Sequence, residues 1–330
     1  DYAVRFAVPE ARQIAFEDVV RGTITTSSDQ MQDFVIQRSD GSPTYMLAAA
    51  VDDALMGITH VIRGEDLISA TPRQILLREA MNITDVPVFG HLPLLVDERG
   101  RPLSKRWGDV AVRAYREQGF LPEAMVNYLA LLGWSYDDKT NLFLIEELVE
   151  KFSLERVGRN PAAFDVNKLE WLNGHYIRRL TPEALAERLV DLCVAEGLEA
   201  DNHRGREILA AVAPLLVERM KRLTEAPPMV RFLFEDVSPD EKASKVLAGQ
   251  GDYLRAVVEE LGALEKWTAA GVEETLRALA ERRELKQKKA FQPIRAAITG
   301  TLVSPPLFES LEILGRERSL ERLRRAAEGN

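Results

Sequence analysis

Hydrophobic and polar positions follow two different periods along this chain. In residues 1–100, short apolar stretches alternate with polar positions, as at Val4-Arg-Phe-Ala-Val8. Turn signals at Arg21-Gly22 and Asp40-Gly-Ser-Pro43 separate these stretches. From about residue 110 onward, apolar residues recur at helical spacing. The first part is therefore predicted to be rich in strands and the second part to be helical.

The clearest predicted helix covers residues 122–132. Pro122 suits the first helical position, where its missing N–H is not needed, and Gly133 is a typical stop. The apolar residues that would share one face are Met125, Tyr128, Leu129 and Leu132. The same spacing recurs in residues 208–217, 272–279 and 320–327. Pro227-Pro228 and Ser238-Pro239 are expected to be linkers between helical blocks, because proline interrupts a helix.

A short β-branched stretch lies within Ile58-Thr-His-Val-Ile-Arg-Gly-Glu-Asp66. Residues 59–62 are predicted to form a buried parallel strand, with Arg63 at the point where the strand ends. Arg63 would then lie at the carboxyl end of the strand, which is where α/β sheets bind ligands. The alternative is a surface arginine that pairs with Glu65 or Asp66.

The segment Thr71-Pro-Arg-Gln74 is predicted to begin the next helix. Thr71 would be the N-cap, Pro72 the first helical residue, and Gln74 the partner that completes a capping box. A strand, a charged loop and a helix would thus follow one another, which is the unit that places ligands in α/β sheets.

Residues 99–106 read Arg-Gly-Arg-Pro-Leu-Ser-Lys-Arg and follow an apolar stretch at residues 91–96. A glycine-containing loop with Ser104, Lys105 and Arg106 is suited to hold a polyphosphate. Lysine gives a mobile positive charge, serine gives a hydroxyl donor, and the loop backbone adds N–H groups. Such groups stabilise the charge that develops on a leaving pyrophosphate. The alternative for so short a segment is an ordinary solvated loop.

The composition narrows the class of protein. At 330 residues with 46% apolar content, the chain is long enough for two or three domains. Its one cysteine, Cys193, excludes an intrachain disulfide, and its apolar helical surroundings predict a buried structural thiol. No apolar stretch approaches the roughly 20 residues that span a bilayer, so we expect a cytoplasmic protein with no membrane partner.

The charge pattern bears on nucleic acid as a partner. A net charge of −9 argues mildly against a chain that binds nucleic acid over its whole surface. Basic residues are nevertheless grouped in the C-terminal half, at residues 178–179, 204–206, 219–222 and 282–289. Each group alone is typical of a solvated helix face, but their restriction to one half favours local patches that contact a nucleic acid.

Taken in order, these segments and several others resemble the bacterial glutamyl-tRNA synthetases, a family of class I aminoacyl-tRNA synthetases. The other segments that carry the resemblance are Arg38-Ser-Asp-Gly-Ser-Pro-Thr-Tyr45, Val51-Asp-Asp53, His91-Leu-Pro-Leu-Leu95, Asn127-Tyr-Leu-Ala-Leu-Leu-Gly-Trp134 and Trp171-Leu-Asn-Gly-His-Tyr176. The resemblance covers essentially all 330 residues. It implies an α/β Rossmann-type catalytic half-domain followed by all-α stem-contact and anticodon-binding domains.

The resemblance also implies a division into five segments. Residues 1–40 would be the end of an acceptor-stem-binding insertion, and residues 41–107 the second half of the Rossmann-type catalytic domain with its phosphate loop. Residues 108–183 would form a helical stem-contact domain. Residues 184–240 and 241–330 would be the two helical anticodon-binding domains.

The chain departs from the family pattern in two places. Class I synthetases carry a His-x-Gly-His element near the start of the catalytic fold, and none of the 4 histidines of this chain lies in one. We therefore expect a C-terminal portion that lacks the first half of the catalytic domain and is inactive by itself. Pro102 stands where the phosphate loop of the family usually begins with lysine; Arg101 is a candidate substitute for that charge.

The resemblance implies a two-step reaction. ATP and L-glutamate would form glutamyl-adenylate and pyrophosphate, and the 3′ end of tRNA(Glu) would then take the glutamyl group. Catalysis of such an in-line attack is mostly positioning and charge stabilisation, with Mg²⁺ sharing the phosphate charge. No residue of this chain is expected to ligate a metal. The expected enzyme is a glutamate–tRNA ligase that acts as a monomer.

Site residues follow from the resemblance, position by position. Lys105 and Ser104 would act on the departing phosphates. The residues expected to bind ATP are Asp66, Leu95, Leu103, Ser104, Lys105 and Arg106. Tyr45 and Arg63 would bind glutamate, the guanidinium facing its γ-carboxylate. Arg219 would inspect the anticodon, since its planar group matches base edges.

Two other readings stay open on the sequence alone. The chain could be a catalytically silent tRNA-binding fragment, which the missing His-x-Gly-His element favours. Alternatively, the enzyme could be non-discriminating and also charge tRNA(Gln), against which Arg219 argues. Asp52 and Asp53 are assigned to structure or to contact with the tRNA end, because adenylation needs no protein base.

Overall fold

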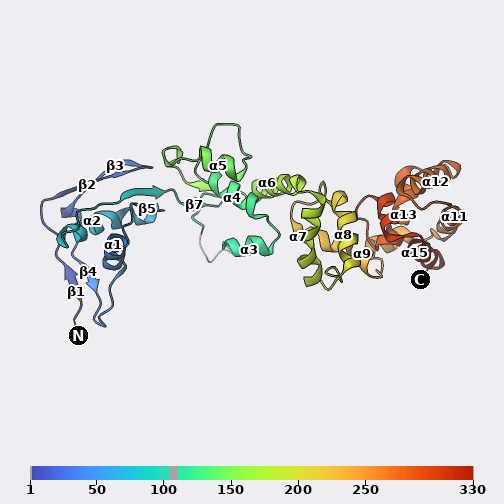
Figure 1. Ribbon diagram of the computed structural model, residues 1–330, viewed down its shortest axis with the longest axis horizontal. Coiled ribbons are helices and arrows are strands. Elements are labelled where there is room, and N and C mark those ends of the chain that lie inside the picture. The colour runs from blue at the N-terminus through green and yellow to red at the C-terminus, as the bar shows by residue number, and fades with distance from the viewer. Residues whose placement is uncertain (1, 98, 104–110, 330) are drawn as a thin grey trace. The chain divides into compact units, whose positions relative to one another are not determined.

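The computed structural model describes residues 2–97, 99–103 and 111–329 (Figure 1). The chain forms two compact units, which we describe separately. The first unit comprises Asp1–Ala111 and Met125–Leu169, and the second comprises Val112–Ala124 and Glu170–Asn330. The five segments expected from the sequence do not coincide with these units, since residues 108–183 fall in both, and they stay a prediction.

The first unit contains a mixed four-stranded sheet. Its strands are β2 (Gln13–Asp18), β3 (Gly22–Ser27), β5 (His60–Gly64) and β6 (Val88–Leu92), in the spatial order β3-β2-β6-β5. β2 and β3 form an antiparallel hairpin, whereas β6 runs parallel to both of its neighbours. The parallel strand predicted near residues 59–62 is confirmed as β5. Its predicted burial is wrong, because β5 lies at the edge of this sheet and Ile62 stays 39% exposed.

Strand β2 brings a carboxylate to a buried position. Alternate residues of the strand, Ile14, Phe16 and Asp18, are buried, as expected for side chains on one face of a strand. Ile14 and Phe16 belong to an apolar core that also contains Ile75, Leu76 and Phe89. Asp18 continues the same face at the end of the strand, so an ionisable group extends the apolar core at the carboxyl end of β2.

Two helices and a separate two-stranded sheet accompany this sheet in the first unit. The antiparallel pair β1 (Val4–Phe6) and β4 (Phe34–Gln37) leads into α1 (Tyr45–Leu55), which carries Asp52 and Asp53 and packs against α2 (Thr71–Ala80). The 3₁₀ turns η1 (Ser28–Gln30) and η2 (Glu65–Ala70) follow β3 and β5. The path β5-η2-α2-β6 is a strand–loop–helix–strand unit, as the sequence predicts.

The remainder of the first unit is built on a second apolar cluster. A short parallel pair joins β7 (Leu95–Val96) to β8 (Ala162–Ala163), and α4 (Pro122–Leu131), α5 (Ile145–Lys151) and η4 (Leu154–Arg156) lie between them in sequence. The cluster consists of Val20, Trp134, Phe143, Leu148 and Val157. The helix predicted at residues 122–132 is confirmed as α4, with Met125 and Tyr128 buried. Leu129 is 42% exposed, so its place on the apolar face was predicted wrongly.

The second unit is helical. Its elements are α3 (Val112–Glu117), α6 (Val166–Arg179), α7 (Pro182–Ala195), α8 (His203–Leu216), η5 (Leu223–Glu225), α9 (Ala226–Phe234), α10 (Glu241–Leu247), α11 (Gly251–Gly262), α12 (Ala269–Arg282), α13 (Gln287–Thr299), α14 (Leu307–Leu314) and α15 (Arg316–Glu328). The start of α4 also belongs to this unit, and the start of α6 belongs to the first. Helix α7 packs along α8, and α11 packs along α15. The helices predicted at residues 208–217, 272–279 and 320–327 are confirmed within α8, α12 and α15.

Two sequence predictions about the second unit have different outcomes. Pro227 and Pro228 do not form a linker, because they lie in the first turn of α9, where no N–H donor is required. Ser238-Pro239 does lie outside the helices, between α9 and α10. Cys193 is fully buried in α7, and burial raises the pKa of its thiol to about 11, so the predicted structural thiol is confirmed.

The search for a membrane-spanning helix gives a negative result. In the part of the chain that the structure describes, no helix combines the length and the apolar character that a bilayer crossing requires.

Candidate active site

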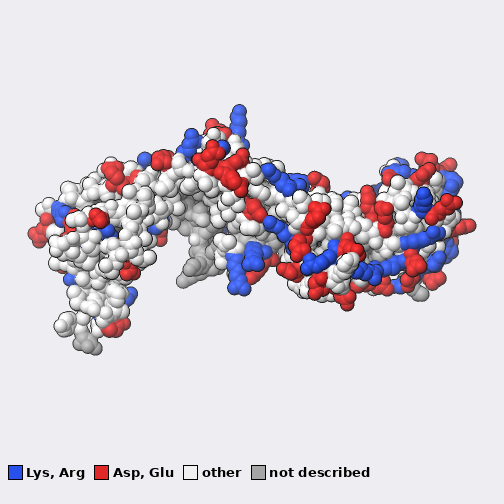
Figure 2. All heavy atoms as spheres, viewed as in Figure 1, with Lys and Arg blue, Asp and Glu red and all other residues white. Residues whose placement is uncertain are grey.

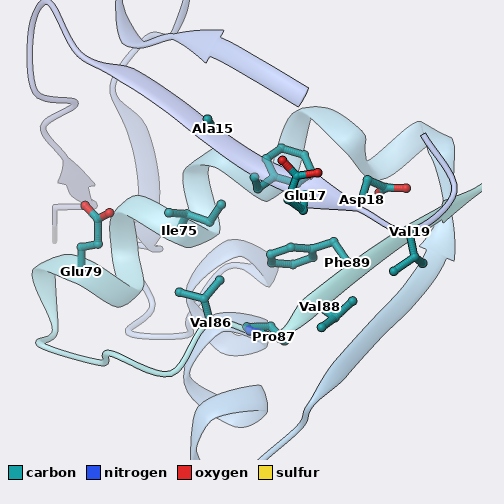
Figure 3. A pocket seen from close by; sticks show the side chains of 11 residues that line it. Ala15, Glu17, Asp18, Val19, Ile75, Glu79, Val86, Pro87, Val88 and Phe89 are labelled. Atoms are coloured by element: carbon teal, nitrogen blue, oxygen red, sulfur yellow. The ribbon is translucent and has the colours of Figure 1, made fainter. Parts of the chain in front are cut away.

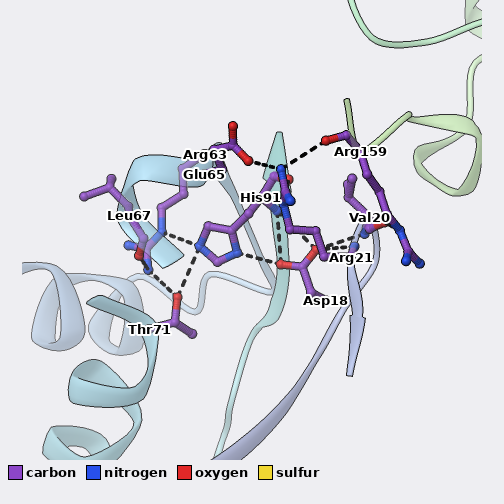
Figure 4. A network of polar contacts seen from close by, with 9 residues as sticks. All are labelled: Asp18, Val20, Arg21, Arg63, Glu65, Leu67, Thr71, His91 and Arg159. Carbon is purple, nitrogen blue, oxygen red and sulfur yellow. Dashed lines mark hydrogen bonds and ion pairs between the residues drawn. The ribbon is translucent and has the colours of Figure 1, made fainter. Parts of the chain in front are cut away.

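Arg63 lies near the carboxyl end of β5 and is held by side chains from three other elements, of which Thr71 and His91 are drawn in Figure 4. Its Nε donates to Nε2 of His91 at 3.2 Å, its Nη1 to the hydroxyl of Tyr45 at 3.0 Å, and its Nη2 to Oγ1 of Thr71 at 2.8 Å. The alternative of a surface ion pair with Glu65 or Asp66 is wrong. Among the described residues, no carboxylate lies within ion-pair distance of Arg63, and Glu65 pairs with Arg21.

Thr71 does not cap α2, contrary to the sequence prediction. It is the first residue of the helix, and η2 leads directly into it, so the backbone N–H of Thr71 donates to the carbonyl of Ile68. The capping box is also wrong, since Nε2 of Gln74 is buried without a hydrogen-bond partner among the described residues. Because the backbone of η2 supplies the preceding turn, the Thr71 hydroxyl is left to accept from Arg63 and to contact His91 Nε2 at 3.2 Å.

Behind Arg63 lies a buried pair formed by His91 and Asp18. Both side chains are fully enclosed, and Nδ1 of His91 lies 2.6 Å from Oδ2 of Asp18. Burial alone would raise the pKa of Asp18. Hydrogen bonds from the His91 ring and from the backbone N–H groups of Arg21 and Val20 outweigh that effect and bring the pKa below its ordinary value. Asp18 is therefore a buried carboxylate that stays ionised.

The hydrogen-bond directions assign the tautomer of His91. The Nε–H of an arginine can only donate, so Nε2 of His91 must accept from Arg63. The ring proton then lies on Nδ1, where it is donated to Asp18. Asp18, His91 and Arg63 thus form a chain in which a neutral imidazole joins a buried anion to a cation.

A count of donors shows what remains for a ligand. A guanidinium has five N–H groups. His91 takes the one on Nε, Thr71 and the carbonyl of Leu67 lie against those on Nη2, and Tyr45 takes one on Nη1. One Nη1–H is left. Since the Tyr45 oxygen accepts from Arg63 and the ring is 49% exposed, its O–H is oriented to donate elsewhere. These two adjacent donors suit the two oxygens of a carboxylate.

An ion pair ties η2 to the end of β6. The carboxylate of Glu65 pairs with Arg21 and also accepts from the backbone N–H of Leu94 at 3.1 Å. Nε of Arg21 donates to the carbonyl of His91 at 3.3 Å, and Arg159 donates to the carbonyl of Val20 at 3.0 Å (Figure 4). This pair fixes the backbone around residues 91–94 to the loop that follows Arg63.

Residues 95–97 and 99–103 pair as the two sides of a hairpin that precedes the expected phosphate loop. The carbonyl of Leu95 accepts from the N–H of Leu103 at 2.9 Å, and Gly100 makes the turn with a φ of +74°. Arg101 pairs with Asp97 at 2.7 Å, and hydrogen bonds from the backbone and side chain of Arg101 lower the pKa of Asp97. The guanidinium of Arg101 is thus engaged by Asp97 on the hairpin. It is therefore less available to replace the positive charge of the lysine that the family usually has at position 102.

The expected ATP-binding residues are only partly covered by the structure. Leu95 and Leu103 face each other across the hairpin, and Asp66 lies exposed in η2. Ser104, Lys105 and Arg106 lie outside the described residues. Their expected contact with the phosphates of ATP therefore stays a prediction.

One cavity lies close to this network but has different chemistry (Figure 3). It has a volume of about 550 Å³ and lies among β2, β6 and α2. Its lining is largely apolar, including Phe16, Ile75 and Phe89, and its ionisable groups are the carboxylates of Glu17, Asp18 and Glu79. A polyphosphate would be repelled by such a lining, so this cavity is not a candidate for the ATP site.

Arg219 is the expected anticodon residue in the second unit. It lies just after α8, its side chain is exposed, and no carboxylate of the described residues lies within ion-pair distance of it. Arg295 on α13 is close enough for the two charges to interact. Burial, and then the charge of Arg219, lower the pKa of Arg295. Two cations therefore lie near each other on this surface.

The basic groups expected to contact nucleic acid are partly neutralised by acidic neighbours. Figure 2 shows Lys and Arg interleaved with Asp and Glu over the helical elements. Arg206 pairs with Glu187 at 2.5 Å, Arg222 with Glu170 at 2.6 Å, and Arg282 with Glu260 at 2.5 Å. In the groups at residues 204–206, 219–222 and 282–289, only a subset of the basic side chains is thus available to a phosphate.

The described residues provide no metal centre. In residues 2–97, 99–103 and 111–329, no group of three or more His, Cys, Asp or Glu side chains is arranged to hold an ion.

Sequence reasoning missed Asp18 and His91. Asp18 lies on the buried face of an alternating strand, which was a usable signal. His91 begins a segment that we quoted for the family resemblance, without a role of its own. What the sequence does not contain is the parallel pairing of Asp18 with Phe89, which brings the two side chains together across the sheet.

Comparison with known proteins gives matches over nearly the whole chain. Residues 1–171 match the family described as tRNA synthetases class I (E and Q), catalytic domain. Residues 183–327 match the anticodon binding domain.

Curated relatives carry the name glutamate–tRNA ligase. The protein from Kineococcus radiotolerans is 46% identical over 98% of this chain and 66% of its own length. The one from Saccharopolyspora erythraea is 43% identical over 97% of this chain and 66% of its own length. The chain spans about two thirds of the length of these relatives.

Two solved structures match the fold. A glutamate tRNA ligase from Elizabethkingia meningosepticum, in complex with its amino acid, has a TM-score of 0.83 and 31% identity over 99% of this chain and 68% of that chain. Glutamate-tRNA synthetase from Elizabethkingia anophelis has a TM-score of 0.80, with the same identity and coverage.

Proposed function

This chain belongs to the class I tRNA synthetases for glutamate and glutamine, and from that premise we propose that it carries the amino-acid-selecting and tRNA-binding parts of a glutamate–tRNA ligase. Its fold is a class I catalytic domain followed by an anticodon-binding domain. The names of the relatives support glutamate as the amino acid.

The observation that carries the proposal is the pair of donors left beside Arg63. The remaining Nη1–H and the Tyr45 hydroxyl lie side by side at 3.0 Å between heavy atoms. A γ-carboxylate accepts from both and meets the positive charge. Glutamine would place an amide NH₂ against one of these donors, which leaves a donor without an acceptor and a charge without a counterion. A site that recognises a polar group in this way rejects the mismatched analogue by roughly 10⁴-fold.

The first reaction step is proposed as follows. The α-carboxylate of glutamate attacks the α-phosphorus of ATP, the bond to the β-phosphate breaks, and pyrophosphate leaves with the electron pair. Ser104, Lys105 and Arg106 are proposed to stabilise that leaving group, with Lys105 and Ser104 as the catalytic pair. Leu95 and Leu103 are proposed to contact the nucleotide through their backbone, and Asp66 is proposed to lie near it.

Mg²⁺ is proposed to arrive with ATP. When bound, the ion would share the negative charge of the phosphates. No step is assigned to a metal ligand of this chain.

In the second step, a hydroxyl at the 3′ end of tRNA(Glu) attacks the carbonyl carbon of the adenylate, and AMP leaves. Arg219, exposed and without a carboxylate partner among the described residues, is proposed to contact the anticodon. The five-segment division, the monomeric state and the cytoplasmic location also stay proposals.

The experiment is glutamate-dependent exchange of labelled pyrophosphate into ATP by the protein that carries this chain. We expect exchange with glutamate and roughly 10⁴-fold less with glutamine. Charging of purified tRNA(Glu) and tRNA(Gln) then tests the second step. Absence of exchange, together with retention of tRNA on a native gel, would favour the silent tRNA-binding alternative. Equal charging of both tRNAs would show a non-discriminating enzyme.

A further inference from the structure

Asp18, His91 and Arg63 are linked in a row by hydrogen bonds. The proposed contacts with the substrate do not explain two of these side chains, Asp18 and His91. His91 is 0% exposed and Asp18 is 3% exposed, so neither can touch glutamate. Both would be costly to bury without a purpose, because an ionised carboxylate and an imidazole prefer water. We propose that Asp18 and His91 are positioning residues that fix the orientation of Arg63 and thereby set the preference for glutamate over glutamine.

This inference rests on the proposed function, because it concerns the amino acid that Arg63 reads. Its physical basis is the planarity of the guanidinium. With Nε held by His91 and Nη2 held by Thr71, the group cannot rotate about its long axis. The free Nη1–H then has one direction only, beside the Tyr45 hydroxyl. An unanchored guanidinium could turn its plane and present a different edge to an amide, which would weaken the rejection of glutamine.

Asp18 controls the tautomer of His91. The carboxylate requires an N–H on Nδ1, and this leaves Nε2 as an acceptor for Arg63. Asp18→Asn would present an amide N–H to Nδ1, and the ring proton would move to Nε2. Two donors would then face each other between His91 and Arg63. The side chain of Asn keeps an oxygen for the N–H groups of Val20 and Arg21, so the turn can persist.

Two substitutions of His91 test its two hydrogen bonds separately. His91→Gln places an amide oxygen near the position of Nε2, so it can still accept from Arg63. His91→Asn places an amide nitrogen near the position of Nδ1, so it keeps the donation to Asp18 and loses the acceptor for Arg63. The two variants remove similar amounts of ring packing and therefore control for each other.

The activity test measures exchange kinetics with glutamate, glutamine and ATP. For His91→Asn and Asp18→Asn we expect KM for glutamate to rise roughly 10- to 100-fold, as for the loss of a hydrogen bond to a charged group, with KM for ATP changed less than about 2-fold. The preference for glutamate over glutamine should fall by a similar factor. His91→Gln should recover most of both losses.

A spectroscopic test does not require the variants to be active. The ¹⁵N shifts of the His91 ring in the unsubstituted protein should show a protonated Nδ1 and an unprotonated Nε2, and Asp18→Asn should reverse them. Protonated Nε2 in the unsubstituted protein would overturn the inference, as would equal behaviour of the Gln and Asn variants at position 91. An unsubstituted protein that does not activate glutamate would instead overturn the proposed function, and with it the role assigned to this chain of contacts.

Discussion

The two units of the protein bury their polar side chains in different ways. In the first unit, Asp18, His91 and Thr71 are buried and joined to one another, and the chain they form ends at Arg63. In the second unit, buried polar side chains bond mostly to backbone groups, some close in sequence and some distant. Ser310 donates to the carbonyl of Pro306 at 2.6 Å, whereas Arg322 donates to the carbonyls of Ile298 and Glu235, both at 2.7 Å, and pairs with Asp236.

This difference separates polar groups that serve the fold from those that serve a site. Asn173 joins backbone groups of two segments, accepting from Leu121 N–H at 2.8 Å and donating to the carbonyl of Lys221 at 2.6 Å. Nothing in that arrangement is left over for a ligand. The network in the first unit leaves one guanidinium N–H and one tyrosine O–H without an acceptor among the described residues, which is the feature expected of a binding site.

The largest effect is expected at Arg63. Arg63→Lys should lower kcat/KM for glutamate by about 10²- to 10³-fold, because an ammonium cannot satisfy His91, Thr71 and Tyr45 and also bind a carboxylate. The free energy of unfolding should change by only about 1 kcal/mol, since the side chain is only partly buried. Exchange kinetics and urea denaturation measure the two quantities. A loss of stability without a loss of kcat/KM would contradict the comparison.

The next effect concerns the second unit. Asn173→Ala should lower the free energy of unfolding by about 2–4 kcal/mol, because it leaves a buried N–H and a buried carbonyl without partners. Asn202→Ala, which removes an exposed N-cap of α8, is the matched control and should cost about 1 kcal/mol. Denaturant titration measures both. Equal effects would mean that burial of Asn173 carries no extra cost.

A smaller effect is expected for Tyr45→Phe. Removal of the hydroxyl deletes one of the two donors proposed for the γ-carboxylate, so KM for glutamate should rise about 10-fold. Stability should change by less than about 0.5 kcal/mol, because the ring is 49% exposed. An unchanged KM with glutamate would remove the tyrosine from the site while leaving the role of Arg63 intact.

The smallest effect concerns Cys193 in the second unit. Burial raises the pKa of its thiol from 9.0 to about 11, so the unfolded chain ionises first as pH rises. The stabilisation of the folded state that comes from the neutral thiol is fully present below pH 9 and should be lost as pH rises from about 9 to 11. Compared with Cys193→Ala, the unsubstituted protein should lose stability more steeply in this window. Thiol labelling of the native protein at pH 8 should be slow, and fast labelling would contradict the burial.

The sequence was sufficient for local features of both units. The strand–loop–helix order around Arg63, the helix at residues 122–132 and the buried Cys193 depend on short-range pattern and composition. The interpretation of Thr71 failed because its hydroxyl is claimed by a tertiary partner, Arg63, whereas capping rules consider only the helix itself. The prediction of a linker at Pro227-Pro228 was wrong because two prolines are compatible with a first helical turn as well as with a linker.

The core of the candidate site could not be predicted in the same way. Asp18, His91 and Arg63 come from three strands, and only the order β3-β2-β6-β5 places them in one row. Strand order depends on contacts between distant segments, which one sequence does not reveal. The resemblance to a known family pointed to Arg63, at one end of this row, and to Tyr45 beside it, but not to the residues behind Arg63.

The most direct test is a crystal structure of the protein that carries this chain with a stable analogue of glutamyl-adenylate. The account predicts the γ-carboxylate within about 3 Å of both Nη1 of Arg63 and the Tyr45 hydroxyl, with the His91–Arg63 hydrogen bond intact. A γ-carboxylate bound by another cation, with Arg63 directed away from it, would contradict the account.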